Sequence, residues 1–211
     1  MITKGEIISG ACLKGIRDAH EKYKEMSGGY WASWAPEYLI SVCIAERIKN
    51  EVKDGYVYLE YPVRDLMKEA NALGAGRIRE GVRPSGRCDI ATANSERQLD
   101  GMIEVKNIRV SSLNYYHYGL DVERIIGVLS RQRKLNTLGF GIYCFNIECQ
   151  VDSNDTNCGR GDFIENIFMN DVCCNYPDFD FTVVSKEIDS GYFEDNNYIS
   201  YAVSILITRK L

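Results

Sequence analysis

The sequence lacks the features that mark membrane-spanning, secreted and several common catalytic classes of protein. Its 211 residues contain no apolar run of about 18 residues, so no membrane-spanning helix is expected. No apolar segment near residue 1 is long enough for a signal peptide, and a cytoplasmic protein is therefore expected. There is also no glycine-rich phosphate loop and no serine, histidine and aspartate set typical of a hydrolase, which disfavours small-molecule enzymes of those types.

Paired cysteine motifs are absent as well, although the sequence contains eight cysteines. Three of them, Cys12, Cys43 and Cys144, lie in apolar segments and are expected to be buried as small hydrophobic side chains. The cysteines of the last third are Cys149, Cys158, Cys173 and Cys174. They lack the two CxxC pairs of a typical structural zinc site, so reduced thiols are expected there rather than bound zinc.

An excess of positive charge is also missing, because the formal net charge is −5. This value argues against a protein that binds nucleic acid by overall electrostatic attraction. The charge is unevenly distributed, since residues 61–138 carry 13 basic and 9 acidic side chains and residues 139–211 carry 4 and 12. The middle of the chain is thus the only net-positive part, which could contact phosphate groups, but the charge distribution alone favours ordinary solvated surface charges.

The pattern of apolar residues predicts helices and strands mixed around one sheet. Helices are expected over residues 4–26, 36–50, 64–73, 118–136 and 163–174. Strands are expected over residues 56–61, 88–93, 102–110, 140–149, 181–188 and 198–208, with the 140–149 strand in a central position. No linker or repeat divides the sequence. We therefore expect a single domain over residues 1–211 of the α/β or α+β class, with a mixed central sheet flanked by helices.

Two short polar patterns lie on neighbouring predicted strands, at residues 88–90 (Cys-Asp-Ile) and 103–106 (Ile-Glu-Val-Lys). Alternation along the second strand puts Glu104 and Lys106 on one face. If the strands pair directly, Asp89 lies beside Glu104, and two neighbouring carboxylates repel unless a cation lies between them. The pattern therefore predicts a divalent-cation site. A solvated hairpin with a surface ion pair is the alternative explanation.

Together with a glutamate on an upstream helix, this arrangement resembles the PD-(D/E)XK nuclease superfamily. Asp89 and the Glu104-Val105-Lys106 segment stand at its two strand motifs, within a matching region of about residues 30–147. Cys88 replaces the loosely kept proline of the first motif, which leaves the acidic position intact. The segment 34–39 is also similar to the start of the helix in uncharacterised bacterial members. The resemblance implies a restriction-endonuclease-like core, with residues 148–211 as an extension.

The resemblance also implies a set of catalytic roles. Asp89, Glu104 and the carbonyl oxygen of Val105 would bind Mg²⁺ or Mn²⁺, cations that favour oxygen ligands. A metal-bound water would attack the phosphodiester. Lys106 would orient or deprotonate that water and offset charge in the transition state.

Glu37 is the expected acidic residue on the upstream helix, where it would bind the metal directly or through water. Glu46 lies nine residues later and therefore faces the opposite side of the helix, so only one of the two can take this role. We favour Glu37. Its alternative is a purely structural one, because an acidic side chain at a helix start also interacts favourably with the helix dipole.

Arginines around the two motifs are the candidate nucleic-acid contacts, namely Arg87, Arg109, Arg124 and Arg131. Helices after the second motif often line the substrate cleft in the superfamily, which implies phosphate contacts for Arg124 and Arg131. The alternative for Arg124 is an ion pair with Asp121, three residues earlier on the same helix. Aromatic residues such as Trp34 could stack on bases, but packing in the core is the favoured explanation.

These features predict a magnesium-dependent nuclease that hydrolyses phosphodiester bonds in DNA, in restriction, defence or repair, settings that the superfamily suggests. RNA stays open as a substrate, as do a homodimer, a partner subunit and the number of metal ions. The alternative is a catalytically inactive nuclease-fold subunit that binds nucleic acid or a partner protein. The acidic residues 139–211 would favour that alternative.

Overall fold

The structure, a computed structural model, describes residues 2–30, 32–74, 78, 80–109, 115–132, 137–150, 166, 170, 172–193 and 196–210. In these ranges the α-helices are α1 (Lys4–Ser27), α2 (Glu37–Glu51), α3 (Val63–Glu69) and α4 (Tyr115–Arg131). The strands are β1 (Tyr56–Pro62), β2 (Arg87–Ala93), β3 (Leu99–Arg109), β4 (Phe140–Gln150), β5 (Phe179–Phe193) and β6 (Asn196–Arg209). Short 3₁₀ helices are η1 (Ala32–Trp34), η2 (Glu80–Val82) and η3 (Cys173–Asn175).

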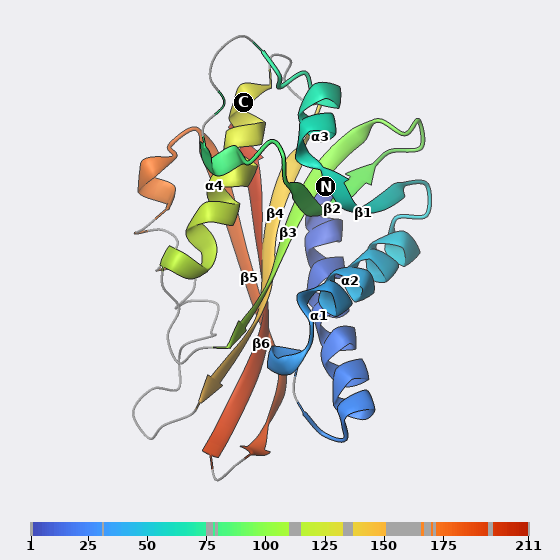
Figure 1. The fold of residues 1–211 in the computed structure, drawn as a ribbon, viewed down its shortest axis with the longest axis vertical. Helices are drawn as coiled ribbons and strands as arrows, with labels where there is room; N and C mark the ends of the chain where they lie inside the picture. The colour runs from blue at the N-terminus through green and yellow to red at the C-terminus, as the bar shows by residue number, and fades with distance from the viewer. Residues whose placement is uncertain are drawn as a thin grey trace.

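The strands form one mixed sheet of six strands in the order β1-β2-β3-β4-β6-β5 (Figure 1). Strands β3 and β4 are parallel, whereas the other neighbouring pairs are antiparallel. A parallel pair needs a crossover connection, and α4 lies between these two strands in the chain. The α+β class with a mixed central sheet is thus confirmed, and β4 lies in the interior of the sheet as predicted.

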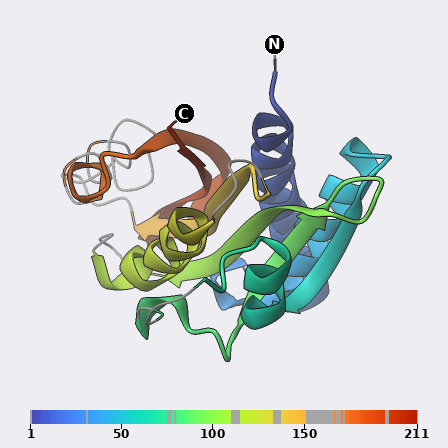
Figure 2. The same cartoon turned by 90° about the horizontal axis from the view of Figure 1, so that it is seen from above.

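Helices cover both faces of the sheet (Figure 2). Helices α1 and α2 pack on one face, in an apolar cluster that includes Ile8, Ile44 and Ile103. Helices α3 and α4 pack on the other face, in a cluster that includes Met67 and Ile125. The central strands are therefore buried on both sides, which explains why their sequences contain apolar residues at successive positions.

Local features define the two ends of α1 and its close approach to α2. A capping box at Thr3 and Glu6 starts α1, and Gly28, with φ of 75°, ends it. A Cβ atom at Gly15 would lie 2.4 Å from the Cα of Ile44, so α1 and α2 cross too closely for any other residue there. The predicted helix over 4–26 is therefore present, one residue longer at its C-terminal end.

Other boundaries differ from the sequence-based expectation. Helix α3 ends at Glu69 rather than near residue 73, and Asn71 then adopts a left-handed φ of 57°. Strands β5 and β6 extend beyond the predicted 181–188 and 198–208, because they pair with each other over nearly their whole length. Most of the predicted 163–174 helix lies outside the described residues.

One cysteine expectation is wrong, because Cys149 is disulfide-bonded rather than reduced. Its partner lies outside the described residues. Cys12, Cys43 and Cys144 are buried free thiols, as the sequence predicts. No helix in the described part of the chain is both long and apolar enough to cross a membrane.

Candidate metal-dependent active site

The site begins where β2 separates from β3. Backbone pairing between these strands runs from the Ala93 end and reaches its last registered pair at Ile90 and Ile103. One residue further on, the Asp89 side chain takes the place of the backbone ladder, since its Oδ2 accepts a hydrogen bond from the Val105 N–H at 2.6 Å. The Asp89 carboxylate is thus fixed to β3, and the predicted approach of the two motifs is present.

The neighbouring strand β1 is distorted at the same level of the sheet. In the pairing of β1 with β2, Leu59 lies opposite Ile90 and Tyr61 lies opposite Cys88. Glu60, between these two pairs, has a φ of 52°. A left-handed conformation is strained for a non-glycine residue, and such strain occurs preferentially at functional sites. The irregularity lies opposite Asp89 and accompanies the departure of that carboxylate from the ladder.

Glu104 lies on β3 and is 2% exposed, which is unusual for a carboxylate. Its Oε1 accepts a hydrogen bond from Arg124 Nη1 of α4 at 2.9 Å. Burial raises the pKa of Glu104 well above its ordinary value, and the Arg124 guanidinium opposes that shift. Arg124 also lies 3.5 Å from Asp121, through Nη2 and Oδ1. Arg124 therefore holds two acidic side chains at once.

Lys106 lies on the same face of β3, two residues after Glu104. Its Nζ is 3.2 Å from Glu37 Oε1 at the start of α2 and 3.5 Å from Asp121 Oδ2 of α4. Burial disfavours the ammonium, but the carboxylates of Asp121 and Glu37 outweigh that effect, so the pKa of Lys106 is raised. Lys106 therefore stays protonated at neutral pH and links acidic residues from two helices.

The electrostatics of Asp89 differ from those of its neighbours. Burial raises its pKa to about 6, the Val105 N–H counteracts this shift, and the Glu37 carboxylate adds to it. Burial is the main cause of this raised pKa, because the Asp89 carboxylate has lost most of the water that would stabilise its charge. This environment suits a further cation beside Asp89.

The structure separates the two helical glutamates. Glu37 lies at the site, where its Oε2 also accepts the Asn107 backbone N–H at 3.3 Å. Glu46 instead lines a surface hollow of about 520 Å³ between α2 and β1, together with Lys49 and Tyr56. Their separation follows from the helical repeat, as the sequence predicts.

Asn107 is a further site residue that no sequence motif indicates. Its Nδ2 donates to the carbonyl oxygens of Ala32 at 2.6 Å and Ala35 at 2.9 Å, in the segment that leads into α2. Its Oδ1 accepts from Asn146 Nδ2 at 3.1 Å, and Asn146 Oδ1 accepts from Ser200 Oγ at 2.9 Å. These hydrogen bonds connect two amides and a hydroxyl across β3, β4 and β6. They hold the start of α2 in place and thereby position Glu37. Its only sequence signal is an amide directly after the Glu-x-Lys pattern.

The four candidate arginines have different environments. Arg87 is exposed, and its Nη1 donates to the Glu60 carbonyl at 3.4 Å. Arg131 is half-buried and donates to the carbonyl oxygens of Ala72 and Gly74, in the segment that follows α3. Arg124 is only 7% exposed, so it binds Glu104 rather than an outside phosphate. The side chain of Arg109 lies outside the described residues.

The donor atoms suit Mg²⁺ or Mn²⁺, although the carboxylates already have cationic partners. Asp89, Glu104, Glu37 and the Val105 carbonyl offer oxygen ligands only, the type that both ions favour. Among the described residues, however, no three acidic, histidine or cysteine side chains lie close enough together to hold a metal. Arg124 and Lys106 lie against Glu104 and Glu37, so these two acids would exchange a cationic side chain for a metal ion.

Comparison with known proteins adds no identification. No family model, no curated protein and no solved structure matches the chain. The superfamily resemblance therefore stays a prediction from the sequence motifs.

Proposed function

We propose that this protein is a metal-dependent nuclease of the PD-(D/E)XK type that hydrolyses phosphodiester bonds in DNA. The observation that supports this proposal most is the meeting of Asp89, Glu104, Lys106 and Glu37 where β2 leaves β3. These groups come from two strands and a helix, and two of them are buried at a cost in stability. A metal-binding and catalytic role would explain why charged groups occupy this buried position.

In this proposal Asp89 and Glu104 hold Mg²⁺ or Mn²⁺, with the Val105 carbonyl and Glu37 as further ligands, Glu37 directly or through water. The ion, when bound, lowers the pKa of a coordinated water and polarises the phosphate. Lys106 has a raised pKa and is therefore suited to donate a hydrogen bond from Nζ rather than to remove a proton. Its ammonium would orient the attacking water and stabilise the charge that develops on the phosphoryl oxygens.

A second candidate is a catalytically inactive nuclease-fold subunit that binds nucleic acid or a partner protein. The ion pair between Arg124 and Glu104 favours it, because the guanidinium already supplies the positive charge that a metal would provide. In the active protein the ion pair between Arg124 and Glu104 would have to break or rearrange when the metal ion binds. In the inactive subunit it stays permanently.

Metal binding separates the two candidates directly. Manganese affinity would be measured by calorimetry for the wild-type protein, for Asp89→Asn, and for Asp180→Asn as a control on an exposed acid of β5. We expect Mn²⁺ binding in the wild type and the control and a loss of at least about tenfold in Asp89→Asn, in line with the sensitivity of metal sites. Cleavage of plasmid, single-stranded DNA and RNA would follow the same order. A wild-type protein that binds no Mn²⁺ and leaves all three substrates intact would rule out the nuclease.

A further inference from the structure

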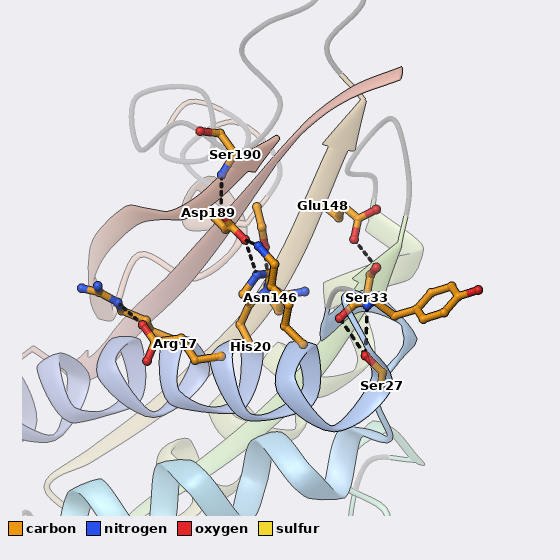
Figure 3. A network of polar contacts seen from close by, with 12 residues as sticks. Arg17, His20, Ser27, Ser33, Asn146, Glu148, Asp189 and Ser190 are labelled. Atoms are coloured by element: carbon orange, nitrogen blue, oxygen red, sulfur yellow. Dashed lines mark hydrogen bonds and ion pairs between the residues drawn. The ribbon is translucent and has the colours of Figure 1, made fainter. Parts of the chain in front are cut away.

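The described segment directly before α2, residues 32–36, is held at three of its five residues. Asn107 binds the carbonyl oxygens of Ala32 and Ala35, and both of these alanines are buried. The Ser33 hydroxyl is hydrogen-bonded to the carboxylate of Glu148 on β4, as Figure 3 shows. Trp34 is thus attached to a backbone that is fixed on both sides of it.

Trp34 nevertheless extends into solvent. Its side chain is 45% exposed, so packing in the core, the explanation favoured from the sequence, is wrong for this residue. Tyr30, also 45% exposed, lies with its ring centroid 6.0 Å from that of Trp34, at an interplanar angle of 70°. The backbone of Tyr30 is fixed in turn, because its N–H donates to Ser27 Oγ at 3.0 Å and its carbonyl accepts from the same hydroxyl at 3.2 Å.

Two rings on a fixed backbone are suited to stacking on planar groups. Their described neighbours in the chain, residues 27–29, 32, 33 and 35, are serine, glycine and alanine. The exposed side chains of Met26 and Tyr38 lie further along the chain on either side. An apolar contact with a partner protein is therefore the alternative that the experiment separates from base stacking.

The rings are also continuous with the proposed active site. Glu37 lies three residues after Trp34 in the chain, and Asn107, which holds the Trp34 segment, directly follows Lys106. A nucleic acid strand with its phosphodiester at Lys106 would therefore pass beside the segment that carries Trp34. Bases within a duplex are covered by their neighbours, whereas an unpaired base exposes its face for stacking.

We propose that Trp34, with Tyr30 beside it, is a stacking site for an unpaired base, and that the substrate is single-stranded nucleic acid or a duplex with a single-stranded segment. This inference rests on the proposed nuclease function. Base stacking on an aromatic side chain is tolerant of sequence, so the site selects strand state rather than base identity.

The test compares ligands that differ only in their bases. Fluorescence anisotropy would measure binding of a labelled oligothymidylate, of the same length of abasic strand, and of a duplex. All proteins would carry Lys106→Met, which keeps the carboxylates and stops the proposed cleavage. We expect tighter binding of oligothymidylate than of the abasic strand or the duplex. Trp34→Ala should weaken oligothymidylate binding about tenfold and leave abasic binding unchanged, whereas Trp34→Phe should lose less than about threefold. Tyr192→Ala, on an exposed aromatic residue of β5, is the control.

Equal binding of the thymidylate and abasic strands by the protein that carries Lys106→Met alone, with Trp34 unchanged, would overturn the inference. Unchanged oligothymidylate binding in Trp34→Ala would also overturn it, and loss of self-association in that variant would show a protein interface instead. The proposed nuclease function has its own readout in Mn²⁺ binding at Asp89. A protein that binds Mn²⁺ and cuts duplex DNA without a preference for unpaired strands would therefore contradict only the stacking site.

Discussion

The two faces of strand β3 are equally buried but opposite in chemistry. Ile103 and Val105 are 0% exposed and join the apolar cluster under α1 and α2. Glu104, between them in the sequence, is 2% exposed on the other face and is paired with Arg124. Burial of an apolar side chain stabilises the fold, whereas burial of a carboxylate costs stability unless a cation compensates for it.

This contrast indicates that one face of β3 contributes mainly to stability and the other mainly to function. The apolar face packs the sheet against α1 and α2 through aliphatic side chains around Ile103 and Val105. On the charged face Glu104 and Lys106 meet Asp121 and Arg124 of α4, and Arg124 Nε is buried without a hydrogen-bond partner among the described residues. A buried ion pair is rarely the most stable solution, so its presence suits a requirement other than folding. Changes on the two faces should therefore have different consequences for stability and for activity.

The largest effect on stability is expected from Arg124→Met. This change leaves Glu104 buried without its cation, and we expect a loss of about 3–5 kcal/mol in the free energy of unfolding. Urea denaturation followed by circular dichroism would measure it. The double variant Arg124→Met with Glu104→Met removes the buried ion pair as a whole, and we expect it to recover most of the loss and to bind no Mn²⁺. If the single variant is as stable as the wild type, the charge pair has no such role.

The next effect concerns Asp89 and its dependence on pH. Its pKa is about 6 in the folded protein against an ordinary 3.8, so the folded state binds more protons than the unfolded state between these values. Stability should therefore fall as pH rises from about 4 to 6, by on the order of 2–3 kcal/mol, and stay constant above that range. Asp89→Asn should lack this fall and be more stable than the wild type at pH 7 without metal. Denaturation curves from pH 4 to 7.5 would show it, and equal pH profiles of the two proteins would refute it.

A smaller effect is expected on the apolar face. Ile103→Val removes one methylene group from a packed cluster and should cost about 0.5–1.5 kcal/mol of stability. Because the side chain points away from the carboxylates, Mn²⁺ affinity and cleavage rate of the folded protein should not change. Denaturation and calorimetry on one preparation would compare the two quantities. A fall in Mn²⁺ affinity of tenfold or more would show that the two faces are coupled through the β3 backbone.

The charged pattern was predictable from the sequence to the extent that it depends on regular strand geometry. Alternation along β3 predicts the shared face of Glu104 and Lys106, and the helical repeat separates Glu37 from Glu46. The contacts of Arg124 and Asn107 were not predictable in this way. Both depend on how α4 and the segment before α2 pack against the sheet, and no local periodicity encodes that packing.

The cysteine prediction failed for a related reason. The spacing of Cys149 in the sequence indicates nothing about which chain segment lies beside it, and disulfide formation depends on that proximity. The exposure of Trp34 is a similar case. Aromatic residues are common in cores, and only the anchoring of its neighbours by Asn107 and Glu148 keeps its ring at the surface.

Substitutions of the two glutamates of α2 should have the smallest effect on stability. They should also have the most selective effect on the metal site. Glu37→Gln should change the free energy of unfolding by less than about 0.5 kcal/mol, because Glu37 is partly exposed and its contact with Lys106 is solvent-screened. The same change should lower Mn²⁺ affinity about tenfold if Glu37 binds the ion directly or through water. Glu46→Gln makes the same chemical change on the far side of the helix, where Glu46 faces the hollow beside β1.

The comparison of these two variants tests the charged face without disturbing the fold. Both lose one negative charge from the same helix, so a general electrostatic effect on cation binding would lower Mn²⁺ affinity similarly in both. A tenfold loss confined to Glu37→Gln would instead require a local role at the site, because Glu37 alone reaches Lys106 and the backbone of Asn107. Equal affinities in both variants and the wild type would remove Glu37 from the metal site and leave it as a structural partner of Lys106.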